Sequence, residues 1–507
     1  MKTFDPSSSS SALVLGLVAA SLASIPSANA DITQRPSNLH RRQAASRARG
    51  NTADQIAIYQ QAFTDPVGAA QAANALPFIA NQFATGSLPE YNLAEDAAQL
   101  PWNTNVPFVP EAAVDGSDAG GWQALPTIDG MTLNRTFAVR PGVTMPFYQS
   151  SGYDSNRVKR AVMIMPGKPR DCWKYTSLVQ NALEVYITNP ASAGSNADGS
   201  SSGGERTSKD DVLILGPCWM NTNDREAGAI QDGELYWYRG QWQSGMASRG
   251  PGDTALSSYQ VMDSFMDTLF DKSQFPALET VVVAGHSLGA QMAQRYAVAK
   301  QPASYDTNIS FWIGNPGSYA WLSPSRPNQN NASCADEYDD WPHGLSGTGL
   351  PPYARERVRD DKQQIVNAFL SRNVHYSLGL LDNGRGDTSC PGSYQGANHL
   401  ERGAHFVEAV ADLAGGRLPR THSANFMPNV SHNDYSMLSY NISLFRLFEE
   451  TPVGAVGSSS NMNGGARGNS TTNAQGNSGN TSPASSYKAG GLAAGAVAAL
   501  AFGMSLL

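Results

Sequence analysis

Short runs of β-branched and other apolar residues alternate with stretches of helical spacing between about residues 108 and 450. This alternation is typical of βαβ units and predicts an α/β fold with a mostly parallel sheet flanked by helices. Each expected core strand ends at a Gly, Pro or polar loop: 161–165, 212–215, 280–284, 310–313, 374–381 and 426–430. Apolar positions at helical spacing predict helices at 54–63, 259–270, 290–299, 361–370, 401–413 and 435–448.

Two stretches of different composition interrupt this alternation. Residues 191–204 are rich in Ser and Gly, and residues 323–352 are rich in Pro and Asn. Both are expected to be surface insertions. The second follows a core strand, where a lid could lie over a site at the strand ends.

The first thirty residues have the layout of a secretory signal peptide. Lys2 precedes an uncharged run from Ala12 to Ile25, and the small residues Ala28-Asn29-Ala30 follow it. The run is shorter than the ~20 residues that cross a bilayer, which favours a cleaved signal over a membrane anchor. His40-Arg41-Arg42 then resembles a dibasic processing site.

The C-terminal segment resembles the signal for a glycosylphosphatidylinositol (GPI) anchor. Residues 489–507 are apolar and uncharged, and a Ser/Asn/Gly-rich stretch, 454–486, precedes them. A transmembrane helix remains the alternative.

These features divide the chain into five expected parts. They are a signal peptide at 1–30, an N-terminal extension of unassigned function at 31–107, one large domain at 108–450, a linker at 451–486 and an anchor signal or hydrophobic tail at 487–507.

The composition supplies material for a large core, since 41% of 507 residues are hydrophobic and only 15% are charged. The net charge is −8, and no cluster of Lys and Arg is interleaved with aromatic residues. We therefore expect no nucleic-acid partner.

Four cysteines in a chain with a secretory signal predict two disulfides: Cys172, Cys218, Cys334 and Cys390. Spacing does not fix the connectivity. Pairing Cys172 with Cys218 and Cys334 with Cys390 is favoured, because each bond would join loops at the same end of a parallel sheet. Seven Asn-x-Ser/Thr sequons are glycosylation candidates: Asn134, Asn308, Asn331, Asn429, Asn441, Asn469 and Asn480.

The segment 280–297 reads as a strand, a sharp turn and a helix, centred on Gly285-His286-Ser287-Leu288-Gly289. In such an elbow the glycines allow a strained turn, and the serine hydroxyl projects at a helix N-terminus, which favours developing negative charge. The chain contains 48 glycines, so the pentapeptide alone is weak evidence for an elbow. The strand before it and the helix after it make the prediction specific. Ser287 is therefore the candidate nucleophile.

A serine nucleophile needs a base and an acid, which follow it along the chain in the order acid, then His. His432 lies between the last apolar run and the last expected helix, where the base is expected, although the sequon at Asn429 would place a glycan close by. The acid is Asp382, which closes the strand 374–381, with Asp387 in reserve.

Acyl transfer also requires N–H donors for the oxyanion. The elbow predicts one at Leu288, and the loop after strand 161–165 offers Gly167 or Lys168, because Pro169 has no N–H. Aromatic residues at 236–242 could line a pocket or serve only in packing. No metal-binding spacing or phosphate-binding loop occurs, so neither a metal nor a cofactor is expected.

Five short motifs carry a resemblance to the α/β-hydrolase superfamily, and within it to uncharacterised secreted members from fungi and bacteria. They are Phe275-Pro276, Gly285-His286-Ser287, Gln294-Arg295-Tyr296-Ala297, Asn315-Pro316-Gly317-Ser318-Tyr319 and Gln395-Gly396. The resemblance covers about 108–450 and implies an eight-stranded sheet and a serine hydrolase triad. It does not fix a substrate.

The expected function is a secreted, glycosylated serine hydrolase at a fungal cell surface, acting on small-molecule carboxylic esters through an acyl-enzyme. The membrane would be reached through the lipid anchor or tail. A non-catalytic surface or adhesion protein of the same fold and a serine peptidase or amidase remain alternatives, and the oligomeric state stays open.

Overall fold

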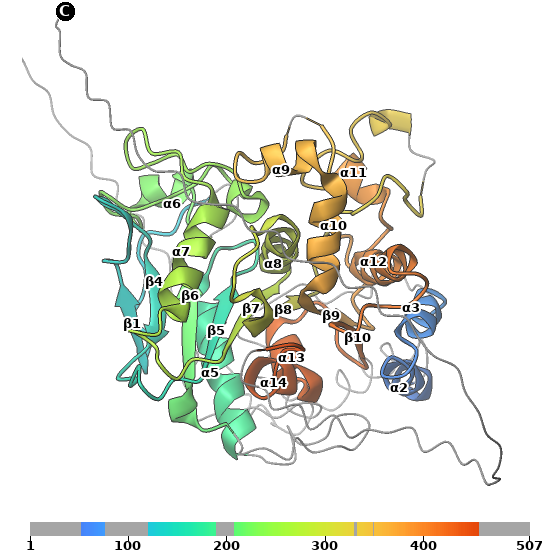
Figure 1. Ribbon diagram of the computed structural model, residues 1–507, viewed down its shortest axis with the longest axis horizontal. Helices are drawn as coiled ribbons and strands as arrows, with labels where there is room; N and C mark the ends of the chain where they lie inside the picture. The colour runs from blue at the N-terminus through green and yellow to red at the C-terminus, as the bar shows by residue number, and fades with distance from the viewer. Residues whose placement is uncertain (1–51, 77–119, 189–206, 329–331, 348, 456–507) are drawn as a thin grey trace, which may run out of the picture. The chain divides into compact units, whose positions relative to one another are not determined.

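The computed structural model describes residues 52–76, 120–188, 207–328, 332–347 and 349–455, and its central feature is an eight-stranded sheet (Figure 1). The strands of this sheet are β1 (Met131–Asn134), β4 (Phe147–Ser150), β5 (Arg160–Met165), β6 (Val212–Pro217), β7 (Thr280–His286), β8 (Ile309–Gly314), β9 (Asn373–Gly379) and β10 (His422–Met427). A separate pair is formed by β2 (Ala138–Arg140) and β3 (Val143–Thr144). The expected signal peptide and anchor signal, and the expected linker beyond residue 455, lie outside the described residues.

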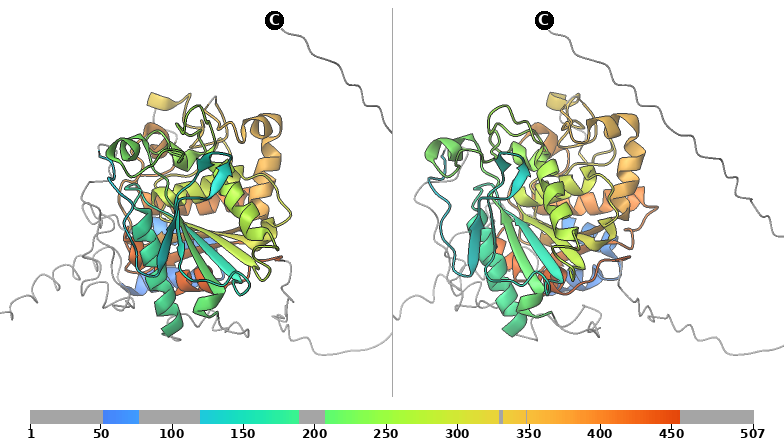
Figure 2. Two further views of the ribbon diagram at one scale, coloured as in Figure 1. Left: turned by 90° about the vertical axis from the view of Figure 1, so that its left-hand side faces the viewer. Right: turned by 60° about the vertical axis from the view of Figure 1, so that its left-hand side comes forward.

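The strand order is β1-β4-β6-β5-β7-β8-β9-β10. Strand β4 is antiparallel to both of its neighbours, and all other neighbouring strands are parallel. Figure 2 shows the twist that accumulates across the sheet. This order and these directions are those of the α/β-hydrolase fold, so the predicted fold class is confirmed.

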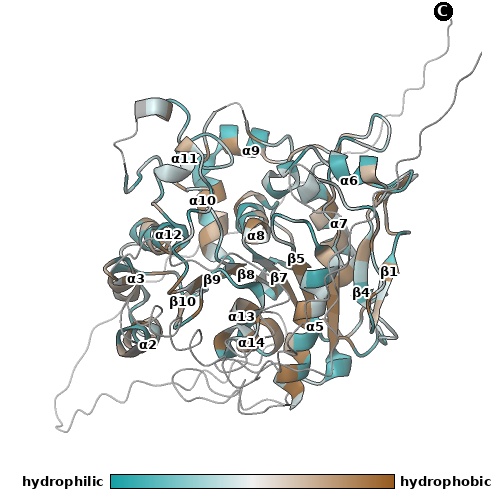
Figure 3. Ribbon diagram, turned by 180° about the vertical axis from the view of Figure 1, so that it is seen from behind, coloured by the Kyte–Doolittle hydropathy of each residue, from teal (hydrophilic) through white to brown (hydrophobic). Residues whose placement is uncertain are grey.

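Helices cover both faces of the sheet. One face carries α7 (Ser258–Phe270), α8 (Leu288–Ala299), α10 (Lys362–Ser371) and α12 (His399–Leu413), and the other carries α5 (Cys172–Thr188), α13 (Asp434–Leu438) and α14 (Asn441–Phe448). Within β7, Val281 and Val283 pack into the first layer and Val282 into the second. A strand covered on both sides is apolar at every position, and Figure 3 shows the hydrophobic central strands beside helices of mixed hydropathy.

Two of these elements differ most from their predicted bounds. The last expected strand, 426–430, instead begins at His422 and ends at Met427. The strand cannot continue through Asn429, which adopts a left-handed backbone conformation with φ 58°. The helix expected at 435–448 is interrupted, and α13 and α14 are separated by Ser439 and Tyr440. The shorter elements are α6 (Thr222–Ala227), α9 (Arg355–Asp360), α11 (Cys390–Ser393), η3 (Lys209–Asp211), η4 (Gln241–Ser244), η5 (Asp306–Asn308) and η6 (Ala332–Cys334).

The helices α2 (Thr52–Gln61) and α3 (Pro66–Asn74) pack against β10 and α12 at the edge of the sheet (Figure 1). Gln55 on α2 is fully buried, and its Oε1 accepts a hydrogen bond from the Asn429 N–H at 2.7 Å. The two helices therefore cover an edge strand that would otherwise present unpaired backbone groups.

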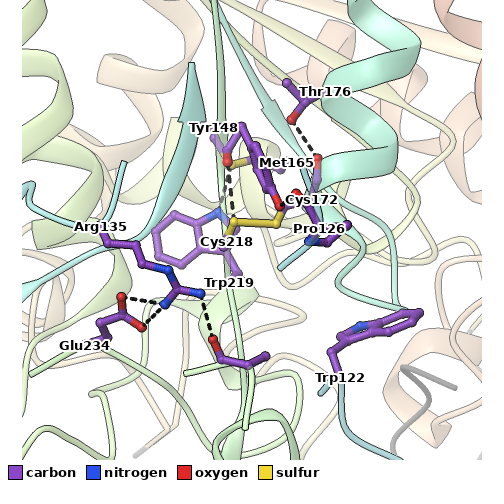
Figure 4. The surroundings of a disulfide bond; sticks show 12 residues. Trp122, Pro126, Arg135, Tyr148, Met165, Cys172, Thr176, Cys218, Trp219 and Glu234 are labelled. Carbon is purple, nitrogen blue, oxygen red and sulfur yellow. Dashed lines mark hydrogen bonds and ion pairs between the residues drawn. A yellow bond between two sulfur atoms is a disulfide. The ribbon is translucent and has the colours of Figure 1, made fainter. Parts of the chain in front are cut away.

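The four cysteines form the two favoured disulfides, Cys172–Cys218 and Cys334–Cys390. The first joins the start of α5 to the residue after β6, and Figure 4 shows it beside Tyr148 and Trp219. Both of its ends therefore lie near the carboxyl edge of the parallel strands. Within the described ranges, the structure contains no helix with the length and apolarity to span a bilayer.

Contacts stabilise the insertion at 323–352 internally and join it to the rest of the domain. Arg326 forms an ion pair with Asp339 inside it at 2.8 Å, and Trp341 Nε1 donates to the Ser244 carbonyl oxygen at 2.7 Å. The Cys334–Cys390 disulfide adds a covalent link.

One glycosylation candidate is incompatible with the fold. Asn308 is buried, and its side-chain amide donates to the Glu279 carbonyl oxygen at 2.7 Å, which leaves no room for a glycan in the folded protein. Asn441 is exposed, and Asn134 and Asn429 are half-buried. The other three candidates, Asn331, Asn469 and Asn480, lie outside the described residues.

Candidate active site

Ser287 lies in the turn between β7 and α8, with a left-handed φ of 57° and a ψ of −120°. A Cβ at Gly285 would lie 2.2 Å from the Gly289 carbonyl oxygen, and a Cβ at Gly289 would lie 2.3 Å from the Met165 carbonyl oxygen. Both positions therefore require glycine. Such a strained turn holds a side chain out from the end of a strand.

Three side chains from separate loops meet at this turn. His432 Nε2 lies 2.9 Å from Ser287 Oγ, and His432 Nδ1 lies 2.7 Å from Asp382 Oδ2. With the proton on Nδ1, the imidazole donates to the carboxylate and accepts from the serine hydroxyl. The structure therefore brings together the three residues that the sequence analysis selected, and Asp382 rather than Asp387 contacts His432.

Asn315 connects the loops that carry Asp382 and His432, a role that the sequence analysis did not foresee. Its Oδ1 accepts from the Gly379 N–H at 2.9 Å, and its Nδ2 donates to the Ser431 carbonyl oxygen at 3.0 Å. Asn315 follows β8 and is fully buried. One amide thus fixes the end of β9 relative to the His432 loop.

Burial and charge oppose each other at the carboxylate and the imidazole. Burial alone would raise the pKa of Asp382, but the adjacent His399 and His432 hold it well below its usual range. Burial would lower the pKa of His432, but the charge and hydrogen bond of Asp382 raise it overall. The carboxylate is therefore ionised at neutral pH, and it stabilises the imidazolium that proton transfer would form.

A second histidine, His399, lies against the same carboxylate. Its Nδ1 is 3.2 Å from Asp382 Oδ1, and its ring stacks on that of His432 at 4.2 Å between centroids. The first turn of α12 holds the loop in place, because the Leu400 N–H donates to the Asp382 carbonyl oxygen at 3.0 Å. Sequence order gave His399 no role, since its contact depends on how α12 packs against the loop after β9.

His286 is a further neighbour of His432, with ring centroids 4.7 Å apart. The Tyr175 hydroxyl is 3.1 Å from His286 Nδ1, and a Cβ at Gly167 would lie 2.7 Å from the same hydroxyl oxygen. Burial lowers the pKa of His286 well below its ordinary value, so its ring is neutral. Tyr175 thereby joins the elbow to the loop after β5.

The oxyanion candidates are the backbone N–H groups of Leu288, in the elbow, and of Gly167 or Lys168, in the loop after β5. Leu288 is the first residue of α8, Gly167 is buried, and the Lys168 side chain is exposed. Within the described part of the chain, the N–H groups of Gly167 and Leu288 donate no hydrogen bond to another residue. Both therefore remain available to an acceptor from outside the chain.

A network of buried ion pairs connects two of the loops that form the site. Lys174 Nζ lies 3.6 Å from a carboxylate oxygen of both Asp171 and Asp434, and all three side chains are buried. Asp171 belongs to the loop after β5, and Asp434 begins α13, two residues after His432. Lys174 thus connects the Gly167 loop to the His432 loop, a link that sequence spacing did not indicate.

Asp387, the reserve acid, has a different partner. Its Oδ2 lies 2.7 Å from His343 Nε2 and accepts from the Ser318 hydroxyl at 2.7 Å. His343 belongs to the insertion. Asp387 therefore ties the insertion to the segment after β9.

The residues with the spacing of a metal site are Asp382, His399 and His432, the one such group in the described residues, whose ligand atoms lie within 4.8 Å of one another. The contact of His432 with Ser287 fits a proton-transfer role better than a metal centre, because the metal would take the Nδ1 atom that orients the imidazole.

Trp219, Trp237 and Trp242 are fully buried and pack on one another, with ring centroids of 5.1 and 6.2 Å from Trp219. Of the two interpretations left open for the aromatic segment, packing is the one that fits these rings. Tyr238 differs, with 38% of its surface exposed.

The strand order and the elbow define the chain as an α/β-hydrolase-fold protein. No protein-family model and no curated protein matches it. Among solved structures, it is similar to LpqC, a poly(3-hydroxybutyrate) depolymerase from Bordetella parapertussis (16% identity, 64% of this chain, 90% of that chain, TM-score 0.41). It is also similar to the siderophore hydrolase EstB from Aspergillus nidulans (11% identity, 66% and 99% coverage, TM-score 0.34). Because these sequence identities and TM-scores are low, the fold is assigned from the strand order.

Proposed function

We propose that the protein is a serine hydrolase in which Ser287, His432 and Asp382 form the catalytic triad. The observation that carries the proposal is the continuous hydrogen-bonded chain from Asp382 Oδ2 through both nitrogens of His432 to Ser287 Oγ, with distances of 2.7 and 2.9 Å. A binding protein has no need of a hydroxyl, an imidazole and an ionised carboxylate in this order.

In the proposed reaction, Ser287 Oγ attacks the carbonyl carbon while its proton passes to His432 Nε2. The carbonyl oxygen gains a negative charge that the N–H groups of Leu288 and of Gly167 or Lys168 stabilise. Collapse of this intermediate breaks the bond to the alcohol, which takes the proton from His432. Water then repeats the sequence on the acyl-enzyme, releasing the acid and regenerating Ser287.

Carboxylic esters are the proposed substrates, because an alkoxide leaves more readily than an amide nitrogen. Initial rates on a panel of short 4-nitrophenyl esters and matched anilides test this. Hydrolysis of esters that Ser287→Ala abolishes, with weaker activity on anilides, supports an esterase. Faster turnover of anilides would favour an amidase or peptidase, and turnover that survives in Ser287→Ala would refute the site.

Secretion and lipid anchoring belong to the same proposal. They are supported by the signal-like N-terminus, by the apolar C-terminal segment and by two disulfides, which form in oxidising compartments. Phosphatidylinositol-specific phospholipase C should release the protein from intact cells. Retention in the membrane fraction after this treatment would favour a spanning helix.

A further inference from the structure

The segment that follows the buried Trp237 lies against the nucleophile elbow. A Cβ at Gly240 would lie 3.6 Å from Leu288 Cδ2, and η4 packs on α8 directly afterwards. Leu288 is the residue after Ser287. The exposed residues just before Gly240 therefore border the nucleophile elbow.

Two arginines share one exposed ring at this border. The Cζ atom of Arg239 lies 5.2 Å from the centroid of the Tyr238 ring, and that of Arg249 lies 5.4 Å from it. Both arginines are exposed. Across the described residues, neither guanidinium forms an ion pair or a hydrogen bond with a protein group, although acidic residues outnumber basic ones by 43 to 35 in the chain.

The backbone fixes both positions. Arg239 has a left-handed φ of 46°, a conformation that is costly for a residue with a side chain. The Arg249 N–H donates to the Tyr236 carbonyl oxygen at 2.8 Å, and Trp237 Nε1 donates to the Met246 carbonyl oxygen at 3.1 Å. An ordered loop thus carries both cations to the ring of Tyr238.

We propose that Arg239, Arg249 and Tyr238 form a subsite for a carboxylate group of the substrate, so that the enzyme prefers esters that carry a free carboxylate. The inference rests on the proposed function. A guanidinium matches a carboxylate with two parallel N–H donors, and stacking on an aromatic ring orients the guanidinium for this contact.

The test compares two pairs of esters in which one member carries a free carboxylate and the other carries a neutral group in its place. On the alcohol side, the pair is 3-(butanoyloxy)benzoate and its methyl ester, assayed by release of the phenol. On the acyl side, it is the monophenyl ester of adipic acid and phenyl hexanoate. The measured quantity is the ratio of kcat/KM for the anionic ester to kcat/KM for the neutral one, which cancels general losses of activity.

Arg239→Gln and Arg249→Gln should each lower this ratio about three- to fivefold in at least one pair, and the double variant more, since exposed charge pairs contribute modestly. Raising the salt concentration should lower the wild-type ratio in the same pair. Arg417→Gln is the matched control, because Arg417 is also exposed but precedes β10, a strand at the edge of the sheet.

Unchanged ratios in Arg249→Gln and in the double variant would overturn the subsite, as would an equal fall in Arg417→Gln, which would indicate only net charge. Turnover of the neutral esters and labelling of Ser287 by a fluorophosphonate report the proposed function separately. If these persist in all variants while the ratios do not change, the subsite fails and the hydrolase remains. If the wild-type protein shows neither ester turnover nor labelling of Ser287, the proposed hydrolase function is refuted.

Discussion

His432 Nε2 lies 2.9 Å from Ser287 Oγ although 145 positions separate the two residues in the sequence. Two strands, β8 and β9, lie between the Ser287 turn and β10, so the contact requires the loops after β7 and β10 to converge at one edge of the sheet. Asn315 supports this convergence from the end of β8, through the Ser431 carbonyl oxygen.

The pH dependence of turnover follows from the raised pKa of His432. Its folded-state pKa lies above the ordinary value of about 6.5. The base works only when neutral, so kcat/KM should fall as the pH drops through this raised pKa. A profile of kcat/KM for a neutral ester should show an acid limb centred above about 6.5, and a midpoint clearly below it would contradict the assignment.

Replacing Asp382 by Asn should remove the charge that stabilises the His432 imidazolium and replace one carboxylate oxygen with an NH₂ donor, which disturbs the orientation of the imidazole. The pKa of His432 should then fall, because burial is no longer opposed, and kcat should drop by about three to four orders of magnitude. The acid limb should move to lower pH. Asp387→Asn is the informative comparison, because Asp387 bonds His343 instead. A larger loss of kcat in Asp387→Asn than in Asp382→Asn would identify Asp387 as the acid of the triad.

His399→Asn tests a positioning role for the second imidazole. His399 helps to hold the pKa of Asp382 low, so its removal should make the carboxylate more basic and raise the pKa of His432. The acid limb should shift to higher pH, with kcat lowered about tenfold and KM little changed. His405→Asn, on the same helix, should leave the profile as it is. An identical profile in both variants would assign His399 to packing alone.

Gln55→Ala should destabilise the protein through the loop that carries His432. The Asn429 N–H would lose its acceptor in a partly buried contact, which costs about 1–3 kcal/mol of unfolding free energy. Gln60 is exposed on the same helix, so Gln60→Ala should change stability little. Urea unfolding of the two variants measures the difference. Equal stabilities would show that α2 does not support the loop.

Removing the Cys172–Cys218 bond by a double Ser substitution should cost about 4 kcal/mol, the chain-entropy value for its sequence separation of 46. The bond begins two residues after Arg170, in the loop that offers Gly167. We therefore expect turnover to fall as well, whereas loss of Cys334–Cys390 should affect mainly stability. Urea midpoints and ester turnover of the two double variants check this. Equal effects on turnover would contradict the placement.

The sequence predicted the parallel centre of the sheet well, because strands covered on both faces form continuous apolar runs, as in β5 and β7. It missed β1 and β4, which are four residues long and partly exposed. It also missed α5, where buried positions occur nearly all round the helix and weaken the helical period.

The candidate site likewise contains residues that the sequence predicted and residues that it missed. Ser287, Asp382 and His432 lie where strands or apolar runs end, so chain order sufficed to select them. The contacts of His399, Asn315 and Lys174 instead join segments distant in sequence. Their roles depend on packing that no local pattern encodes.

Labelling with a fluorophosphonate, followed by peptide mass spectrometry, tests the central claim most directly. The reagent should add covalently to the peptide that contains Ser287 in the wild-type protein, and Ser287→Ala should prevent the addition while the fold is retained. Labelling that persists in this variant, or that maps to another residue, would contradict the account.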